Sequence, residues 1–426
     1  MTLPASADVV VIGAGIAGLS AARELAARGV GPIVVLERDY AGAGATGRNV
    51  ARIRRMQLTE ELSLVAMACQ DKYERMGGDL GSNVLFYRLG YAWILYEHDE
   101  VERMRDIVAM HARLGIRSAL LSPDETLRHL PVFEGGEPVA GSVLSDDAIV
   151  HHDAVVWAHL DHLVGRDVSI HPRTTVTAIE RDDSRVRAVV TDKGRIETPV
   201  VLNVTDAWSA EINALAGVRM PNRPLRREVL VTAPLRRSIE AAVTFYRPNE
   251  GWFNQTLRGE IVMGAVDPDE PVGVDQRSSW AFLQRTAALM TRKAPALGDV
   301  TVIRQWAGMY DITPDHLPIV GPTAQLDGWW QAVGWSGRGM LLAPYLTELL
   351  AEYLVTGTAP AMLSTFLPDR FPPTDDRATP MEADYYARYG AGSASAAGSA
   401  SGSTSAAPPP ASTTMSSGNT TSSPPS

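Results

Sequence analysis

Three glycines near the N-terminus have the spacing of a loop that holds phosphate groups. Gly13, Gly15 and Gly18 follow an apolar run, Asp8–Ile12, which reads as a short buried parallel strand, and they open a segment rich in Ala and Leu. In such a loop the first glycine permits a tight strand-to-helix turn, the second lets the backbone approach a pyrophosphate, and the third lets helix and strand pack closely. The start of the helix offers N–H groups to the phosphates. The spacing therefore predicts a dinucleotide site.

A carboxylate at the expected distance supports this prediction. A second apolar run, Ile33–Leu36, ends at Glu37, about 20 residues beyond the last glycine, where an acid accepts hydrogen bonds from ribose hydroxyls. An acid there disfavours a 2′-phosphate, so FAD or NAD is expected rather than NADP. A glycine-rich turn in an ordinary α/β unit is the alternative interpretation. The motif alone does not distinguish FAD from NAD.

Basic side chains follow the next loop, AGAGATGRN. Arg48 and Asn49 end this loop, and Arg52, Arg54 and Arg55 come directly after it. A guanidinium group can bind a carboxylate through two parallel hydrogen bonds. The cluster therefore predicts a site for an anionic ligand. The solvated start of a basic helix is the alternative interpretation.

A second basic residue between glycines precedes the last expected helix. Gly337, Arg338 and Gly339 come shortly before Leu341–Leu354, which has helical spacing. Backbone N–H groups and the positive end of a helix dipole at such a turn can stabilise negative charge. A plain capping turn is the alternative interpretation.

Strand and helix patterns divide the chain into two kinds of segment. Short apolar runs such as Asp8–Ile12 and Val200–Asn203 predict buried strands of a parallel sheet, and Val50–Met76 has the spacing of a long helix. Residues 225–265 alternate over several short runs, which predicts an antiparallel sheet. We therefore expect an α/β protein (α+β two-domain), with a discontinuous Rossmann-like domain and an antiparallel-sheet substrate domain.

The expected boundaries follow from where these patterns change. The dinucleotide-binding domain is expected at residues 1–85, 140–220 and 304–370, and the substrate domain at residues 86–139 and 221–303. Residues 388–426 are rich in Gly, Ser, Ala, Pro and Thr and almost free of charge. Such a segment cannot bury enough apolar surface to offset its chain entropy, so a disordered tail is expected there.

The composition argues against several classes of protein. The chain has 426 residues, 45% of them hydrophobic, which is enough for a large core. A net charge of −10 argues against nucleic-acid binding through phosphate neutralisation. The single cysteine, Cys69, excludes an intrachain disulfide and a Cys-based zinc site, and no metal site is expected. No apolar run approaches the ~20 residues of a membrane span. Because the glycine motif lies so near Met1, no secretory signal is expected, and a cytoplasmic protein is the prediction.

Four further stretches, taken in order, are similar to one protein family. They are GRNVARIR (Gly47–Arg54), HHDAVVW (His151–Trp157), RQWAGMYDITPDHLPIVG (Arg304–Gly321) and GWSGRGMLLAP (Gly334–Pro344). Together with the N-terminal motif they resemble the D-amino-acid-oxidase/glycine-oxidase (DAO) superfamily of FAD-dependent oxidoreductases. Within it the resemblance is closest to the sarcosine oxidase β-subunit group, and it spans residues 6–365.

This resemblance implies a resident FAD, held without a covalent bond, and oxidation of the C–N bond of an amine or amino acid. Hydride transfer from the carbon next to the nitrogen to flavin N5 gives an imine, and O2 or another acceptor takes the electrons. Sarcosine, a proline-type amine, an opine or a related secondary amine is the expected substrate. One alternative is a flavin-binding β-subunit that is active only with partner subunits in a hetero-oligomer. A flavin monooxygenase is the other.

The resemblance also implies roles for single residues. The catalytic candidates are Arg48, Asn49, Arg54 and Arg338. The candidates for binding FAD are Gly13, Gly15, Gly18, Glu37, Arg38, Gly47, Arg48, Asn49, Val176, Thr205, Gly308, Gly334, Gly337, Arg338, Gly339 and Met340. The candidates for binding substrate are Arg54, Tyr91, Tyr246, Phe253, Trp306 and Tyr310, although aromatic residues on alternating strands are often core residues. His152 matches the histidine that carries covalent FMN in heterotetrameric sarcosine oxidases, so FMN attachment is one interpretation of it and a structural histidine is the other.

Three departures from the family pattern concern the expected site. Asp206 stands where most relatives have a glycine near the FAD, and Leu341 stands where many have a lysine that binds the substrate carboxylate. Gly259–Asp275 holds no lysine, whereas monomeric sarcosine oxidases use one on this sheet to activate oxygen. The missing carboxylate-binding lysine favours a larger or less acidic amine, and the missing lysine on the sheet favours a dependence on partner subunits.

Overall fold

The computed structural model describes residues 2–247 and 249–371, all of which belong to the compact unit Met1–Gly392. The tail expected at residues 388–426 therefore lies outside the described residues. Among the helices of this described part, none is long and apolar enough to cross a membrane.

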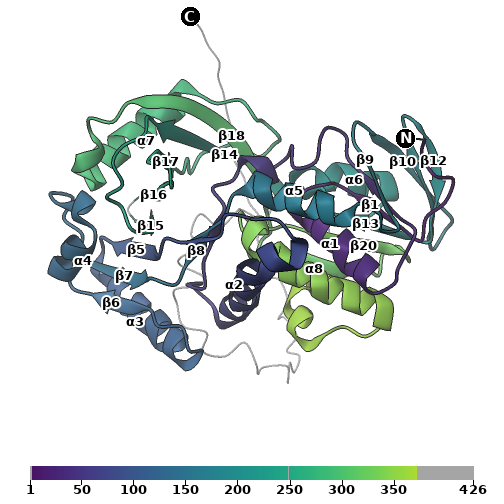
Figure 1. The fold of residues 1–426 in the computed structure, drawn as a ribbon, viewed down its shortest axis with the longest axis horizontal. Coiled ribbons are helices and arrows are strands. Elements are labelled where there is room, and N and C mark those ends of the chain that lie inside the picture. Colours follow the sequence, from purple (N-terminus) through teal and green to yellow (C-terminus); the bar gives the residue numbers. More distant parts are fainter. Residues whose placement is uncertain (1, 248, 372–426) are drawn as a thin grey trace, which may run out of the picture. The chain divides into compact units, whose positions relative to one another are not determined.

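A six-stranded sheet carries the glycine motif (Figure 1). Its strand order is β19–β20–β13–β1–β2–β9, and all neighbouring strands are parallel except β19 and β20. In chain order the strands are β1 (Val9–Ile12), β2 (Ile33–Leu36), β9 (Val168–His171), β13 (Val200–Asn203), β19 (Ile319–Pro322) and β20 (Trp329–Val333). Because β1 has parallel neighbours on both sides, the loop after it opens at the carboxyl edge of the sheet, where such sheets bind ligands.

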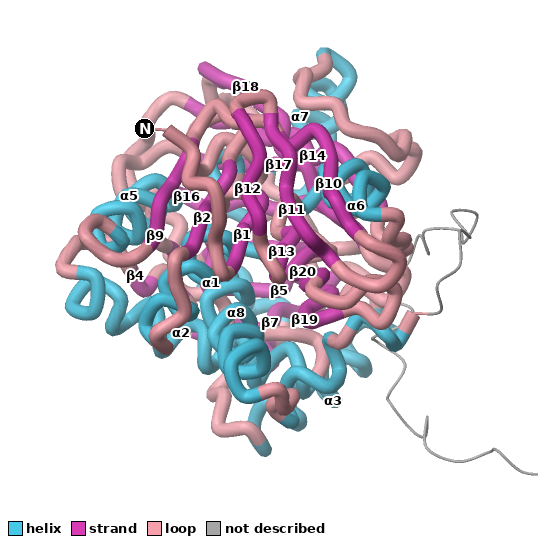
Figure 2. The backbone as a smooth tube through the Cα atoms, turned by 90° about the vertical axis from the view of Figure 1, so that its right-hand side faces the viewer, coloured by secondary structure: helices cyan, strands magenta, loops and turns pink. Residues whose placement is uncertain are grey.

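Both faces of this sheet are covered, which explains why its strands are apolar throughout. Val9 and Val11 of β1 pack into one core with helices from four parts of the chain. These helices are α1 (Ile16–Ala27), α2 (Glu60–Leu80), α5 (His152–Leu163) and α8 (Gly339–Thr356). Figure 2 shows α1 and α8 together on one side of the strands.

Val10 and Ile12 point the other way, because successive side chains of a strand alternate between its faces. They belong to a second core, which includes Ala216 of α6 and residues of a small three-stranded sheet. The elements are α6 (Ser209–Ala216), β10 (Val176–Arg181), β11 (Val186–Thr191) and β12 (Gly194–Glu197).

A larger, eight-stranded sheet lies at the left in Figure 1 and has the order β18–β14–β17–β16–β15–β5–β7–β6. Its strands are β5 (Tyr91–Leu95), β6 (Ala119–Leu121), β7 (Ala140–Leu144), β14 (Arg223–Thr232), β15 (Ala242–Phe245), β16 (Gly251–Gln255), β17 (Ile261–Ala265) and β18 (Val302–Ile312). The helices packed on it are α3 (His98–Arg113), α4 (Pro123–His129) and α7 (Trp280–Lys293).

This sheet differs from the expected one in two respects. Its neighbouring strands pair antiparallel except β15 and β5, which are parallel. These two strands belong to different passes of the chain, because the chain leaves this sheet after β7 and returns to it at β14. It also includes β7 (140–144) and β18 (302–312). The expected boundaries place all of β7 and most of β18 in the dinucleotide-binding domain, at residues 140–220 and 304–370. The domain boundaries themselves stay a prediction.

The prediction of a long helix over Val50–Met76 is wrong at its N-terminal end. Helix α2 begins only at Glu60, after Thr59, whose hydroxyl accepts a hydrogen bond from the Leu62 N–H at 3.3 Å. Thr59 is a favourable N-cap, and the two glutamates after it suit the positive end of the helix. The residues before it are extended instead, with β3 (Arg52–Ile53) paired to β8 (Ala148–Ile149), which also pairs with β4 (Tyr87–Arg88).

Candidate active site

One cavity of about 370 Å³ is lined both by the loops at the carboxyl edge of the six-stranded sheet and by residues of the eight-stranded sheet. Most of the residues that the sequence assigned to the site line this cavity. They are Gly13, Gly15, Glu37, Arg38, Arg48, Asn49, Arg54, Tyr91, Val176, Thr205, Tyr246, Gly308, Tyr310, Gly337, Arg338, Gly339 and Met340. Segments from many parts of the chain therefore meet at one place.

The glycine loop is packed so tightly that side chains would not fit in it. A Cβ on Gly13, which has φ +115°, would lie 3.0 Å from the Val204 carbonyl oxygen, and a Cβ on Gly18 would lie 2.0 Å from the Gly13 carbonyl oxygen. Gly15 is the N-cap of α1 and makes no side-chain cap, while Gly15, Ile16 and Ala17 line the cavity. The start of α1 thus presents its backbone and its positive dipole end to a ligand.

Glu37 closes this end of the cavity from the end of β2. Its carboxylate accepts hydrogen bonds from the N–H groups of Ala14 at 3.0 Å and Asp39 at 2.9 Å. Each carboxylate oxygen has a second lone pair, so the fixed side chain can still accept from a ligand hydroxyl. Beside it the Arg38 guanidinium lies 4.4 Å from the ring centre of Trp208, an unpredicted residue of the cavity wall.

The loop before β3 is held against the eight-stranded sheet. The indole N–H of Trp306 donates to the Arg48 carbonyl oxygen at 3.0 Å, and Arg48 Nε donates to the Ala43 carbonyl oxygen at 3.2 Å. A Cβ on Gly308 would lie 3.3 Å from Arg48 Cβ. Trp306 is not part of the cavity wall, so the structure places it as a support for this loop and not as the predicted substrate contact. Gly47 has a similar packing role, because a Cβ there would lie 2.6 Å from the Gly42 carbonyl oxygen.

The start of α8 forms another part of the wall. Gly337 has φ +79°, and a Cβ on it would lie 2.4 Å from the ring of Tyr310. Arg338 is buried, and its guanidinium donates to the His316 carbonyl oxygen. Gly334 lies outside the wall and donates its N–H to Asp311 at 2.8 Å. The turn therefore brings backbone N–H groups and a helix start to the cavity, as its sequence predicted.

Arg52 and Arg54 face the same end of the cavity because the chain is extended there and residues two apart share a side. Arg54 Nη1 donates to the Tyr91 hydroxyl at 2.7 Å, and this hydroxyl donates to Thr244 Oγ1 at 2.6 Å. Arg52 Nη1 donates to the same Thr244 oxygen at 3.2 Å, and Arg52 Nε donates to Asn254 Oδ1 at 3.1 Å. The two guanidinium groups thus share one hydrogen-bond network through Tyr91 and Thr244.

Two further charged residues, which were not predicted from the sequence, line the cavity together with Arg52 and Arg54. Arg227 of β14 lies with its guanidinium carbon 5.4 Å from the ring centre of Tyr310, and Glu250 precedes β16. Burial raises the pKa of Glu250, while the charges of Arg227 and Arg54 act in the opposite direction. Arg226, the neighbour of Arg227, turns away and pairs with Glu270 at 2.8 Å. Because side chains alternate along a strand, only one of Arg226 and Arg227 can face the cavity, but the sequence does not indicate which one.

Asp206 occupies a position that suits glycine, since its φ is +49°. Its Oδ1 atom is buried and has no hydrogen-bond partner. Burial, and next the charge of Asp311, raise the pKa of Asp206 well above its ordinary range. Burial also raises the pKa of Asp311 to about 7, although Asn222 and the Gly334 N–H donate to it. At neutral pH this pair therefore retains a proton.

Phe253 is a correction to the predicted substrate contacts. It is fully buried in the core below the eight-stranded sheet, with its ring centre 5.5 Å from that of Phe133. Its neighbour Trp252 lines the cavity instead, because side chains on β16 alternate between the two faces. Tyr246 does line the cavity and stacks on Trp93 at 4.9 Å.

The family model for FAD dependent oxidoreductases (DAO) matches residues 8–353, which include all the residues that line the cavity. The chain belongs to the DAO family of FAD-dependent oxidoreductases. One relative by sequence is sarcosine oxidase subunit beta of Rhodobacter capsulatus. It is 26% identical to this chain over 358 residues, which cover 83% of this chain and 86% of that protein.

Solved structures support the DAO fold. L-proline dehydrogenase from P. horikoshii superimposes with a TM-score of 0.81 at 28% identity and covers 87% of this chain and 98% of its own. Glycine oxidase from Geobacillus kaustophilus gives a TM-score of 0.78 at 20% identity, covering 87% of this chain and all of its own. The predicted family resemblance and fold class are confirmed.

The cavity fits the FAD that this family uses. A dinucleotide needs a close backbone approach for its pyrophosphate, an acid for a ribose and a long cavity for its ring system. Here Gly15 lines the cavity and has no side chain that could keep a ligand from its backbone, and Glu37 supplies the acid. The wall continues from there to Met340 and to the arginines of the substrate end.

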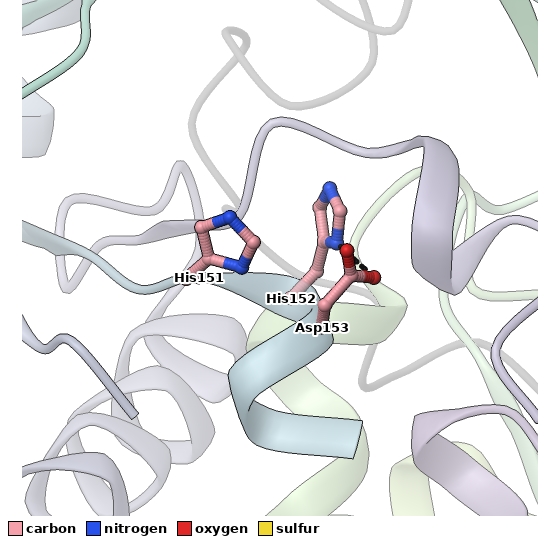
Figure 3. A group of neighbouring side chains, drawn as sticks. All are labelled: His151, His152 and Asp153. Carbon is pink, nitrogen blue, oxygen red and sulfur yellow. Dashed lines mark hydrogen bonds and ion pairs between the residues drawn. The ribbon is translucent and has the colours of Figure 1, made fainter. Parts of the chain in front are cut away.

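His152 lies apart from this cavity, at the start of α5 (Figure 3). Its Nδ1 atom is 2.9 Å from Asp153 Oδ1, and the ring is partly exposed. Atoms of His151, His152 and Asp153 that could bind a metal lie within 4.8 Å of one another, although the sequence predicted no metal site. The side-chain interaction in Figure 3 is the Asp153 contact, which suits the structural interpretation of His152; FMN attachment stays a prediction.

Proposed function

We propose that this DAO-family protein oxidises the C–N bond of an amine or amino acid that carries a carboxylate. The observation that supports the proposal best is the position of Arg54, which lies in the same cavity as the glycine loop and the start of α8. A guanidinium group fixed at such a place orients a carboxylate through paired hydrogen bonds. Sarcosine, proline-type amines and opines all meet this requirement.

FAD, when bound, supplies the acceptor for a hydride that leaves the carbon next to the substrate nitrogen, and the substrate becomes an imine. The residues of the chain have simpler tasks. Gly15 and Glu37 would hold the dinucleotide without a covalent bond, and the start of α8 at Gly339 stabilises negative charge in the cavity through its dipole. Tyr91 holds the Arg54 guanidinium in place. No acid–base triad is required of the protein.

Anaerobic reduction of the bound flavin tests this proposal. We expect sarcosine, proline or another carboxylated amine to bleach the absorbance of the holoenzyme near 450 nm, roughly where any oxidised flavin absorbs. Arg54→Met should raise the concentration needed for half-maximal rate by roughly 30-fold or more, because a charge-assisted pair is lost. Failure of every carboxylated amine to reduce a fully loaded flavin would contradict the proposal.

Arg55→Met is a matched control for this experiment. Arg55 is the next residue, but its guanidinium pairs with Asp71 at 2.7 Å and it does not line the cavity. Its substitution should change the half-saturating concentration by less than about twofold, as is usual for a surface ion pair. An equal effect of the two substitutions would show that Arg54 does not bind the substrate carboxylate.

A second candidate function is that of a β-subunit that works only with partner chains. It is favoured by the partly exposed His152 outside the cavity and by the 86% coverage of a protein named as a subunit. In that case the isolated chain should show flavin reduction by the amine but slow oxygen consumption. Size-exclusion chromatography together with oxygen and dye-acceptor assays separates this function from that of a complete oxidase.

A further inference from the structure

Asp206 places a carboxyl group in the cavity wall at a position that is unfavourable for one. Its φ of +49° lies in the left-handed region, which glycine adopts at a far lower cost than other residues. Its Oδ1 atom is shielded from solvent and has no hydrogen-bond partner among the described residues. A backbone outlier combined with an unsatisfied buried oxygen in a cavity wall points to a contact with a ligand.

The place of Asp206 follows from the parallel sheet. It comes three residues after β13, which pairs with β1, and the Val204 N–H donates to the Ile12 carbonyl oxygen at 3.1 Å. The loop after β13 therefore lies beside the glycine loop after β1. On its other side Asp206 is close to Asp311, which accepts the N–H of Gly334 in the turn before α8. A dinucleotide that extends from the glycine loop to the start of α8 would therefore pass Asp206, which lines the same cavity.

Of the two acids in this pair, Asp206 is the one that keeps the proton. Asp311 accepts hydrogen bonds at 2.8 Å from Asn222 Nδ2 and from the Gly334 N–H, and such donors stabilise a negative charge. The buried Oδ1 atom of Asp206 has no such donor. Burial, and next the charge of Asp311, raise the pKa of Asp206 well above its ordinary range. Because two close carboxyl groups do not readily ionise together, Asp206 faces the cavity as a neutral acid.

The charged surroundings of Asp206 are simple. The elements packed against its turn are mainly β14, β18, β20 and α6, and β20 has no titratable side chain. Asn222 donates to both Ser209 and Asp311, so the start of β14 and the end of β18 lie next to the turn. The titratable side chains on these neighbouring parts are Arg223, Arg227, Tyr310, Asp311 and Glu211. Among them, Asp311 is the one whose charge acts on Asp206.

We propose that Asp206 binds the FAD of this family as a neutral acid and donates its carboxyl O–H to an acceptor oxygen of the cofactor. FAD has acceptor oxygens on its pyrophosphate, its ribityl chain and its flavin ring, and only the protonated form of a carboxyl group can donate to them. Ionisation of Asp206 removes this donor and brings a negative charge near the pyrophosphate. The affinity for FAD is therefore complete below the raised pKa of Asp206 and falls as the pH rises through it. This inference concerns the cofactor and does not depend on which amine is oxidised.

Equilibrium titration of the full chain with FAD, after removal of its flavin, tests this proposal at pH 6 and at pH 9. For the wild type we expect the dissociation constant to rise at least about tenfold between these pH values, because a donor is replaced by a like charge. Asp206→Asn keeps an N–H donor, tolerates the positive φ and cannot ionise, so its constant should change by less than about threefold. Asp206→Gly removes the donor and should bind FAD roughly tenfold more weakly than the wild type at pH 6.

Glu137→Gly is the matched control for the glycine variant. Glu137 is also an acid at a positive φ, +53°, but it is exposed and does not line the cavity. Its substitution should leave the dissociation constant for FAD unchanged at both pH values.

The Tm of the flavin-free protein separates a ligand contact from a structural role. Asp206→Gly should lose affinity for FAD without a fall in Tm, because glycine relieves the backbone strain at this position. A fall in Tm that parallels the loss of affinity would assign Asp206 a structural role instead. The inference is also wrong if Asp206→Gly binds FAD as tightly as the wild type at pH 6, or if Asp206→Asn and the wild type respond equally to pH. None of these results bears on the proposed function, which depends on reduction of the loaded flavin by an amine.

Discussion

The two ends of the cavity are built on different physical principles. At the dinucleotide end, the glycine loop at Gly13 and Gly15 and the acid Glu37 lie within 25 residues of one another in the chain. At the substrate end they come from side chains on β3, β5, β14, β15 and β18. A pyrophosphate and a ribose are the same in every FAD protein, so a local motif can bind them. A substrate varies, and its contacts are assembled from distant segments.

The largest expected effect is at the dinucleotide end. Gly18→Ala places a Cβ 2.0 Å from the Gly13 carbonyl oxygen, a contact that only movement of the loop can relieve. We expect the purified variant to contain less than roughly one tenth of the wild-type flavin, since the loop no longer fits a pyrophosphate. Gly78→Ala in α2, where a Cβ meets nothing within 4 Å, is the control and should retain flavin. Normal flavin content in Gly18→Ala would show that the loop tolerates side chains.

A smaller effect, confined to the substrate end, is expected for Tyr91→Phe. The change removes the hydroxyl that links Arg54 to Thr244 and leaves the ring in place. We expect the KM for the amine to rise about tenfold while the flavin content stays the same, because one hydrogen bond to a charged group is lost. Tyr87→Phe, at a residue outside the cavity wall, should not change the KM. Loss of flavin from Tyr91→Phe would contradict the division of the cavity into two ends.

Asp206→Asn probes the buried carboxyl pair through its dependence on pH. The pKa values of Asp206 and Asp311 are raised in the folded protein. An aspartate of the unfolded chain loses its proton above a pKa near 3.8, whereas these two carboxyl groups keep theirs to a higher pH in the folded protein. Stability therefore falls as the pH rises from about 4 through these raised values. Asn removes one carboxyl and tolerates a positive φ, so the Tm should be roughly 2 °C higher than wild type at pH 8 and nearly equal at about pH 4. An equal difference at both pH values would contradict the shared proton.

The smallest expected effect concerns the support of the loop between the two ends. Trp306→Phe removes the N–H that donates to the Arg48 carbonyl oxygen and keeps an aromatic ring. The loss of about 1 kcal/mol should weaken FAD binding roughly fivefold, which equilibrium titration of the apoprotein with FAD would measure. Trp157→Phe, at an exposed residue of α5, is the control. An unchanged affinity would mean that the loop is held by its other contacts alone.

Much of the site was predictable because it depends on local geometry. The turn at Gly13 and the helix start at Gly337–Gly339 were predicted from glycine spacing, and both line the cavity. The start of α2 could also have been predicted, since Thr59 followed by two acids is typical of a helix N-terminus. The prediction began the helix at Val50 instead, because the residues before Thr59 also have helical spacing. Phe253 was misplaced because an alternating strand does not reveal which of its faces meets the core.

The dinucleotide loop and its acid could be predicted from the sequence, because they depend on residues close together in the chain whose spacing is set by backbone geometry. Which arginines line the same end of the cavity depends on the fold of the whole chain. Arg52 and Arg227 are 175 positions apart, as their numbers show, and nothing in either local pattern brings them together. Their approach depends on how β3 and β14 pack around Tyr310, and that packing is a property of the whole core.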